Sequence, residues 1–232
     1  MEQIIYEDDQ VLVFHKPSGL AVQTSRFGQQ DVVSILKNYR AKKRELPYIA
    51  LINRLDQPVE GLLLVAKTKE AAAALTGQLT AHRLDKCYRA VVRNDRENPL
   101  RVGEEGVLTD YLLKDGRTNC SGVVQKGTEG AKEAVLKYEV EKVCKSMAEL
   151  YIELCTGRHH QIRVQMANAA LPILGDLKYG RGAAAEGFEM KTPLALCSVK
   201  IVFMHPKSRK KMEFEIEPEN PAFQLLCGFE PA

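Results

Sequence analysis

The sequence predicts an α+β protein with a mostly antiparallel, mixed central sheet flanked by a few helices. Short apolar or alternating segments outnumber the helical patterns, many follow one another directly, and brief turns rather than long linkers separate them. The 232 residues contain no internal repeat and no Gly-, Ser- or Pro-rich linker. We therefore expect a single domain over residues 1–232.

The first predicted elements are two strands and a helix. Apolar residues at 4–6 and 11–14 predict the strands, and the turn-forming residues 16–19 end the second one. Asp31 is a typical helix-capping residue, and apolar residues recur at helical spacing behind it. This pattern predicts a helix over 32–43.

The next elements add strands to the sheet. The continuous apolar run 61–66 predicts a strand buried on both faces, and the residues at 69–81 predict a helix. Another strand is predicted at 88–92. Apolar and charged residues alternate over 136–140, which indicates a half-buried strand, and 147–155 is its predicted antiparallel neighbour.

The last third of the chain is predicted to contain one more helix and two more strands. The helix begins after Thr156-Gly157, with Ile162 and Met166 on its apolar face. Strands over 194–204 and 210–216 complete the predicted sheet.

Composition excludes several classes of protein. A net charge of +3 is too small for a generally polycationic protein, although it permits a locally basic surface. No apolar run approaches the roughly 20 residues of a membrane helix, and the N-terminus lacks the features of a secretory signal. The six cysteines form no C-x-x-C pair, which disfavours metal fingers and a disulfide scaffold. We expect a cytoplasmic protein with reduced thiols that does not bind membranes.

Several common catalytic motifs are missing. The glycines form no phosphate loop or dinucleotide fingerprint, and there is no Gly-x-Ser-x-Gly elbow. His159 and His160 suggest a metal site, but neighbouring side chains on a helix point about 100° apart. More simply, one histidine faces solvent or phosphate and the other forms a local hydrogen bond, so no metal is predicted.

Two polar stretches are candidates for the functional site. Arg54 and Asp56 lie in a proline-containing loop directly before the buried strand; Asp56 either carries chemistry or merely caps a turn and pairs with Arg54. Residues 156–163 crowd polar groups into a helix start, where unpaired backbone N–H groups favour phosphate. Taken alone, this second stretch also fits a solvated helix start.

The motifs together resemble the RluA-type pseudouridine synthase family, over roughly residues 4–217. The resemblance implies that family's fold, with a central active-site cleft, and its reaction, the isomerisation of uridine to pseudouridine in RNA. The matching segments, in the order expected for the family, are 5–8, 11–13, 16–20, 54–56, 61–68, 86–90, 156–164 and 174–180.

The resemblance also implies roles for individual residues. Asp56 is the catalytic carboxylate, which attacks the ribose or acts as a base on it. Arg163 pairs with Asp56 and keeps it ionised, because a nearby cation lowers a carboxyl pKa and a guanidinium can hold it with two hydrogen bonds. Tyr88 stacks on the uracil or accepts a ribose proton. The reaction is redox-neutral and releases no base, so no cofactor is implied.

Four further residues are implied to bind the substrate. Arg54 helps to displace the target base from the RNA helix, since the nucleotide must be flipped out before its glycosidic bond can be reached. Ile162 packs against that base, and Arg158 and His160 contact the RNA. The expected partner is ribosomal or transfer RNA, and the default expectation is a monomer with no obligatory protein partner.

The sequence departs from the family pattern at a few positions. Asn53 stands where histidine is usual, Val59-Glu60 where Thr-Ser is usual, and Cys197-Ser198 where His-Ala is usual. We expect these changes to affect the RNA-facing rim. From the resemblance we expect the catalytic domain alone, without the small RNA-binding domain that some members carry before it.

Two other functions remain open at this stage. One is a catalytically silent RNA-binding or ribosome-assembly factor on the same fold, which the departures favour. The other is a hydrolase that uses Asp56 with His159 or His160; a glycosidase needs a second carboxylate, which no motif of the sequence places.

Cations gather in three clusters, of which we expect the first and third to face RNA. The clusters are Lys37, Arg40, Lys42, Lys43 and Arg44; Arg83, Lys86, Arg89, Arg93 and Arg96; and Lys207, Arg209, Lys210 and Lys211.

Overall fold

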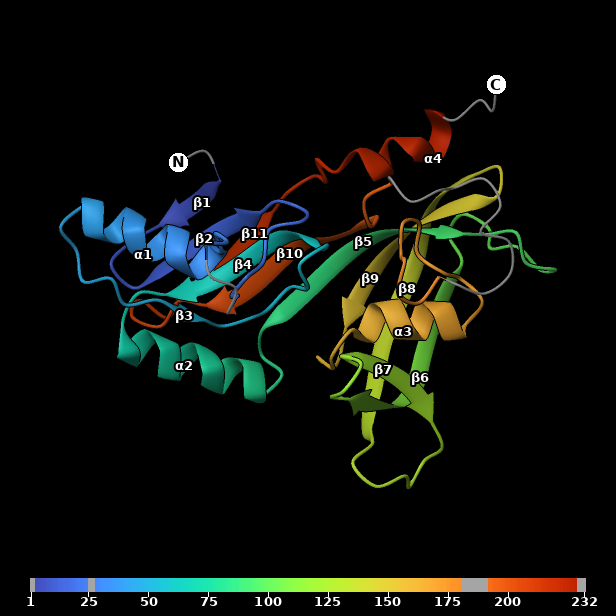
Figure 1. The fold of residues 1–232 in the computed structure, drawn as a ribbon, viewed down its shortest axis with the longest axis horizontal. Helices are drawn as coiled ribbons and strands as arrows, with labels where there is room; N and C mark the ends of the chain where they lie inside the picture. The colour runs from blue at the N-terminus through green and yellow to red at the C-terminus, as the bar shows by residue number, and fades with distance from the viewer. Residues whose placement is uncertain (1–2, 25–27, 181–191, 229–232) are drawn as a thin grey trace. The chain divides into compact units, whose positions relative to one another are not determined.

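The computed structural model describes residues 3–24, 28–180 and 192–228, and these form two compact units (Figure 1). Unit 1 comprises Met1–Lys86 and Ser198–Pro218, and unit 2 comprises Cys87–Cys197 and Glu219–Ala232. The prediction of one domain over residues 1–232 stays a prediction. No helix in the described ranges is long and apolar enough to cross a membrane.

Unit 1 is a sheet with two helices. Its strand order is β1-β2-β4-β10, with β11 paired to β10 and β3 to β4. Apolar side chains of β2, β4, β10 and α2 form its core. The elements are β1 (Ile4–Glu7), β2 (Val11–Lys16), α1 (Val32–Lys42), β3 (Ala50–Leu51), β4 (Glu60–Ala66), α2 (Lys69–Thr80), β10 (Leu196–Met204) and β11 (Lys211–Glu215).

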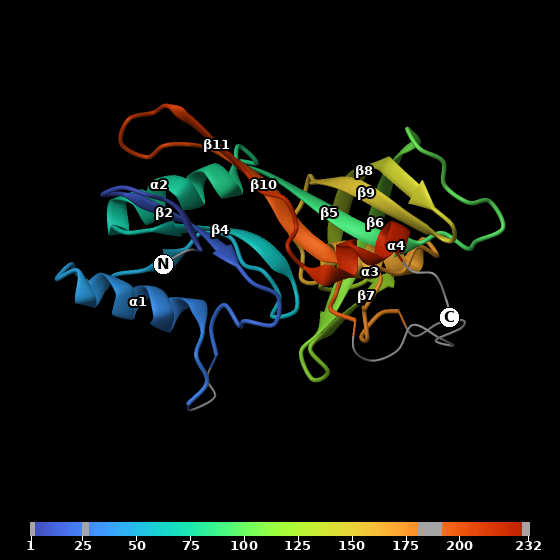
Figure 2. The ribbon, with the colours of Figure 1, turned by 90° about the horizontal axis from the view of Figure 1, so that it is seen from above.

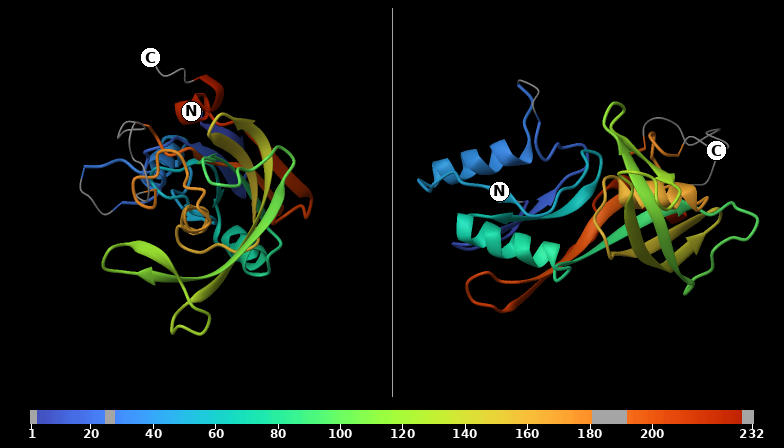
Figure 3. Two further views of the ribbon diagram at one scale, coloured as in Figure 1. Left: turned by 90° about the vertical axis from the view of Figure 1, so that its right-hand side faces the viewer. Right: turned by 90° about the horizontal axis from the view of Figure 1, so that it is seen from below.

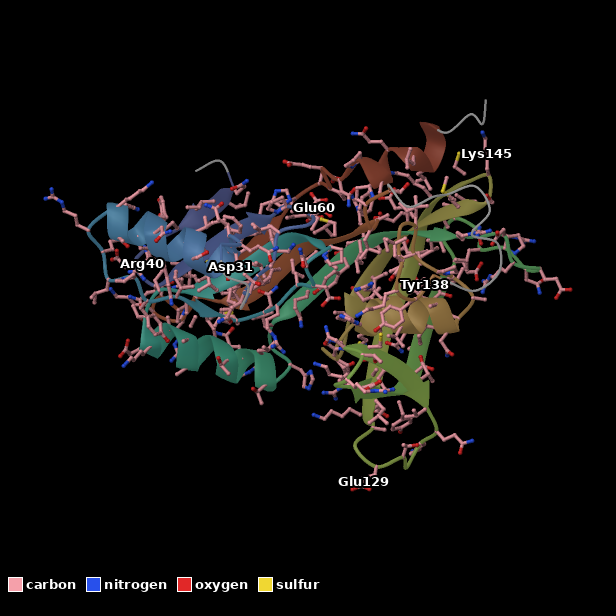
Figure 4. All side chains as sticks on the ribbon, viewed as in Figure 1. Asp31, Arg40, Glu60, Glu129, Tyr138 and Lys145 are labelled. Atoms are coloured by element: carbon pink, nitrogen blue, oxygen red, sulfur yellow. The ribbon has the colours of Figure 1, made fainter. Side chains whose placement is uncertain are left out.

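Local sequence explains the helices of unit 1. Asp31 accepts a hydrogen bond from the Ser34 backbone, and Ser34 reciprocates, which forms a capping box at the start of α1. Asp31 and Arg40, both labelled in Figure 4, lie at opposite ends of this helix. The Thr68 hydroxyl caps α2 by accepting a hydrogen bond from the Ala71 N–H. The predicted helices over 32–43 and 69–81 are confirmed to within one residue.

Unit 2 is an antiparallel sheet in the order β5-β9-β8-β6-β7, with one main helix (Figure 3). The predicted pairing of the 136–140 and 147–155 strands is confirmed. Its elements are β5 (Asp85–Arg93), β6 (Glu105–Asp115), β7 (Cys120–Val124), β8 (Lys132–Cys144), β9 (Met147–Leu154), α3 (Gln161–Asn168), the 3-10 turn Pro221–Phe223 and α4 (Leu225–Gly228).

Two features of unit 2 differ from the prediction. The β6–β7 hairpin was not predicted, although Asp115-Gly116 near its turn is a recognised hairpin signal. The helix predicted after Thr156-Gly157, α3, begins only at Gln161, because His160 adopts a left-handed conformation with φ 56°. All side chains from Gln161 to Met166 are buried, so α3 starts buried on every side rather than on one apolar face. The α+β class itself is confirmed.

Candidate active site

Asp56 lies on a tight turn between β3 and β4 in unit 1. The Val59 N–H donates to the Asp56 carbonyl at 3.0 Å, which closes the turn. Leu55 is buried, whereas Asp56 is half-buried and Arg54 is exposed. Leu55 therefore anchors the turn in the core, and its charged neighbours on either side remain accessible to solvent.

Lys16 binds this turn to the end of β2. Its side chain is fully buried, and its ammonium donates to the carbonyls of Pro17, Leu20 and Gln57 at 3.0, 2.8 and 3.0 Å. A buried ammonium is costly unless its donors are satisfied, and here three carbonyls satisfy them. The position of the Asp56 backbone thus depends on a lysine 41 residues from Gln57.

Three more hydrogen bonds connect the same two segments. The Ser18 hydroxyl donates to the Pro58 carbonyl at 2.8 Å. Gly19 and Gln57 exchange two bonds, one from the Gly19 N–H and one from the Gln57 amide, both at 3.0 Å. The segments 16–20 and 56–59 are separate motifs in the sequence, and these hydrogen bonds join them in the fold.

Two of the departures from the family pattern are part of the interior of unit 1. Asn53 is 5% exposed; its amide donates to the Leu62 carbonyl at 3.0 Å and accepts from the Leu64 N–H at 2.8 Å. Glu60 is 2% exposed, and its carboxylate lies 3.0 Å from the His15 ring. The expectation that these side chains shape an RNA-facing rim is wrong for both. Both are buried, and their polar atoms bind backbone groups of β4 in the case of Asn53 and the His15 ring in the case of Glu60.

Gly61 fixes where the Asp56 loop ends. Its φ of 126° is in the region that favours glycine, and a Cβ here would lie 2.4 Å from the backbone N and O of Ser198 in β10. Ser198 itself is fully buried. Only a glycine lets β4 begin this close to β10.

Arg163, in α3 of unit 2, is held by Asp176. Its guanidinium is 7% exposed and donates from Nε and Nη2 to the two carboxylate oxygens of Asp176, both at 2.8 Å. It also lies over the Tyr179 ring, 5.1 Å from the centroid. Two parallel bonds and a ring face fix the plane of the guanidinium, which lysine cannot reproduce.

The electrostatics of this pair favour both charged forms. Burial by itself raises the pKa of the Asp176 carboxyl, but the hydrogen bonds and charge of Arg163 outweigh it, together with the N–H groups of Tyr179 and Lys178. The net result is an Asp176 pKa below its ordinary value. The pair therefore remains ionised at neutral pH.

His159 and His160 join this structure as hydrogen-bonding groups. Their rings stack with centroids 3.7 Å apart. Nδ1 of His160 lies 2.6 Å from the Tyr179 hydroxyl, and Nδ1 of His159 lies 2.9 Å from the Ser121 hydroxyl. The Ser121 N–H also donates to the Tyr179 hydroxyl at 2.9 Å. Both side chains thus form a hydrogen bond to a neighbouring segment, whereas the sequence predicted such a bond for only one of them.

The other candidates of unit 2 lie on β5 and near α3. Tyr88 is 6% exposed and stands opposite Ile152 of β9. Ile162 is 4% exposed. Arg158 is half-buried, and its Nε donates to the Glu133 carbonyl at 2.7 Å, so at least part of its guanidinium stabilises the fold.

The candidates thus fall into two groups: Arg54 and Asp56 in unit 1, and the other five in unit 2. Each unit is described by itself, so the pairing of Asp56 with Arg163 stays a prediction. Residue-by-residue reasoning missed Asp176 and Tyr179, which hold Arg163 and His160. Both are part of the late motif at 174–180, and this is the signal that indicates them.

Two bacterial relatives align with most of this chain. The chain is 32% identical over 222 residues to the ribosomal large subunit pseudouridine synthase D of Vibrio cholerae, covering 91% of this chain and 65% of the relative. It is 31% identical over 228 residues to the synthase C of Salmonella typhimurium, covering 96% and 68%. The chain therefore spans about two thirds of the length of these relatives.

Solved structures agree on the fold. The human RNA pseudouridylate synthase domain containing 4 matches with a TM-score of 0.73 at 21% identity, over 97% of this chain and 92% of that one. The human domain containing 1 matches with a TM-score of 0.71 at 19% identity, over 93% and 83%. The model of the RNA pseudouridylate synthase family matches residues 10–168. Together with the bacterial relatives, this match establishes that the chain belongs to the RNA pseudouridylate synthase family.

Proposed function

We propose that this chain isomerises uridine to pseudouridine in ribosomal RNA of the large subunit. Family membership supports the reaction, and the names of the bacterial relatives support the substrate. The observation that carries the proposal is the Asp56 loop: a half-buried carboxylate on a backbone that Lys16, Ser18 and Gln57 hold in place. A catalytic carboxylate needs this combination of fixed position and access to the substrate.

The chemistry requires one carboxylate and conserves all heavy atoms of the substrate. The bond from uracil N1 to ribose C1′ breaks, the uracil turns, and a bond from C5 to the same C1′ forms. C5 loses its hydrogen as a proton and N1 gains one, so nothing is oxidised or reduced. In this proposal the Asp56 carboxylate either attacks the ribose or removes a proton from it, and the base stays in the site throughout.

In this proposal the catalytic domain includes both units, because Asp56 comes from one and Arg163 from the other. Arg163 is suited to pair with a second carboxylate, because Asp176 and the Tyr179 ring already fix its plane. Tyr88 and Ile162 contact the uracil, Arg54 helps to displace the base, and Arg158 and His160 contact the RNA. Because Nε of Arg158 already donates to the Glu133 carbonyl, we give Arg158 a smaller part in RNA binding than His160.

The decisive experiment replaces Asp56 with asparagine. Because pseudouridine formation removes the C5 hydrogen, we measure tritium release from RNA transcribed with uridine labelled at C5. Asp56→Asn is expected to lower the rate by about 10³-fold or more, since a neutral amide can neither attack nor accept the proton. Asp9→Asn, which changes an exposed carboxylate of the same unit, is the matched control and is expected to retain activity.

Three substrates distinguish the alternatives. Large-subunit ribosomal RNA is expected to release tritium, and a transfer RNA transcript to release little. If transfer RNA alone reacts, the proposed substrate is wrong. If every RNA binds and none reacts, the chain is instead a catalytically silent RNA-binding factor on this fold, and if Asp56→Asn retains full activity, the role of Asp56 is wrong.

A further inference from the structure

The three basic clusters look alike in the sequence, but they differ in how their cations are paired with carboxylates. In the first two clusters, several cations are already paired with carboxylates of the fold. These pairs are Arg40 with Glu45, Lys43 with Glu7, Arg89 with Glu141, Arg93 with Asp95, and Arg96 with Glu104. A cation that neutralises a neighbouring carboxylate attracts an external phosphate less strongly. Both of these clusters also contain exposed cations without an ion pair in the described ranges, such as Lys37, Lys42 and Arg44.

The third cluster differs in that its unpaired cations lie within one short turn. Residues His205–Lys210, here called the basic turn, connect β10 to β11 and carry the exposed side chains of Lys207, Arg209 and Lys210. None of these three side chains forms an ion pair with a residue in the described ranges. Lys211, which follows, pairs with Glu213 at 3.3 Å. The basic turn thus presents three uncompensated charges within four residues.

A buried histidine organises the turn from inside. His205 is 6% exposed, and its Nδ1 accepts from the Ser208 N–H and lies 3.0 Å from the Ser208 hydroxyl. Nε2 of the same ring lies 2.9 Å from a carboxylate oxygen of Asp8. Asp8 in turn accepts from the N–H groups of Gln10 and Val11. The imidazole therefore connects the turn to the start of β2.

The base of the hairpin is also fixed. The Gln78 side chain of α2 exchanges two hydrogen bonds with the Met204 backbone, at 2.7 and 2.8 Å. His205 and Lys210 close the loop through a backbone bond at 2.8 Å, and the Arg209 N–H donates to the His205 carbonyl at 2.9 Å. Figures 2 and 3 show this loop beside α2. The cations are thus presented on a backbone that loses little entropy when it binds.

Arg209 occupies a position at which its side chain is not favoured by the backbone. Its φ is 59°, a left-handed conformation for which glycine or asparagine is the usual choice. An arginine here brings a conformational cost and adds a charge at the tip of the turn. The exposed Arg44 of the first cluster has the same φ of 59°, so this strain accompanies the charge at the tip of the turn and does not by itself distinguish the turn from the first cluster.

We infer that the basic turn binds the phosphate backbone of the RNA substrate, through Lys207, Arg209 and Lys210. This inference rests on the proposed function, which makes RNA the partner. Phosphate contacts supply most of the affinity in protein–nucleic acid complexes and are independent of sequence. The turn therefore strengthens binding and orients the RNA without contributing to the chemical step.

The test combines Lys207→Gln, Arg209→Gln and Lys210→Gln in one variant. Its affinity for a synthetic RNA stem–loop is measured by fluorescence anisotropy over a range of KCl concentrations. Loss of three phosphate contacts is expected to reduce the slope of log affinity against log salt by about 2 to 3. All three side chains are exposed, and an unchanged melting temperature verifies that the variant folds.

A matched variant carries Lys37→Gln, Lys42→Gln and Arg44→Gln, which removes the same charge from exposed positions on and after α1. The inference requires the basic-turn variant to lose clearly more slope than this control. Equal losses in both variants, or a wild-type slope in the basic-turn variant, would overturn it.

Tritium release separates this inference from the proposed function. At saturating RNA the basic-turn variant is expected to keep its kcat and to show a raised KM. If the wild type releases no tritium from any RNA, the proposed function fails, whereas the salt slopes still decide whether the turn binds phosphate. If the wild type is active and the slopes do not differ, only the inference about the turn is wrong.

Discussion

The two candidate catalytic groups are held in different ways. In unit 1, the fold fixes the backbone around Asp56: Lys16 binds the Gln57 carbonyl and Ser18 the Pro58 carbonyl, while the Asp56 side chain remains half-buried. In unit 2, the fold fixes the side chain of Arg163 itself, through two bonds to Asp176, and buries it.

The difference follows from what each group has to do. A carboxylate that reacts with a substrate needs its own oxygens accessible, so only its backbone can be restrained. A guanidinium that orients another group acts best when its plane is fixed in advance. The comparison predicts that unit 2 is destabilised most by loss of the charge of Asp176, which holds Arg163. It also predicts that the Asp56 loop is destabilised most by loss of the hydrogen-bond donor Lys16.

The largest effect on stability is expected from Asp176→Asn. It leaves the Arg163 guanidinium buried without its counter-charge, and breaking a buried ion pair in this way costs about 3–5 kcal/mol. Urea denaturation measures the free energy of unfolding, with Asp115→Asn as a control at an exposed carboxylate of the same unit. A variant as stable as the wild type would show that Asp176 does not hold Arg163, and the comparison would fail.

A somewhat smaller effect is expected from Lys16→Met. Methionine keeps much of the buried volume but leaves three carbonyls without their donor, which costs about 3 kcal/mol. Urea denaturation gives this value, and Lys69→Met provides the control at an exposed lysine of unit 1. Because the Asp56 loop loses these hydrogen bonds, the rate of tritium release should fall even under conditions where the variant is fully folded. If the variant kept the full rate, Lys16 would not be needed to position Asp56.

The smallest effect concerns the half-buried carboxylate of Glu7 in unit 1. Burial alone raises the pKa of Glu7, but hydrogen bonds from Lys67, Tyr39 and Lys43 outweigh it and lower the pKa from 4.5 to about 2. A carboxyl with a lowered folded-state pKa stabilises the fold fully above about pH 4.5, and this contribution is lost as the pH falls towards 2. We expect a loss of about 2 kcal/mol across this range.

Glu7→Gln tests this assignment. The variant is expected to be less stable than the wild type at pH 7 and to lose less stability between pH 5 and pH 2.5. Parallel stability curves for the two proteins would show that other carboxyl groups control the acid response. Amide hydrogen exchange then distinguishes the two units. Glu7→Gln is expected to lower protection in α1, and Asp176→Asn is expected to lower protection in α3.

Much of the fold is readable from short stretches of sequence. Asp31 identifies the start of α1, and the run at 61–66 identifies β4 as a buried strand. Caps and apolar periodicity act over a few residues, so they leave a local signal. The β6–β7 hairpin was missed because its strands are largely exposed and show no clean apolar alternation.

The sequence by itself determined the class of fold, the order of the motifs, and Asp56 and Arg163 as the candidate residues. Only the tertiary structure decided how these residues are held: that Lys16 reaches Gln57, 41 residues away, and that His160 reaches Tyr179, 19 residues away. It also decided that Asn53 and Glu60 are interior groups and that the cations of the basic turn are uncompensated. The physical reason is that burial and pairing depend on which distant segments meet, and local patterns do not encode those meetings.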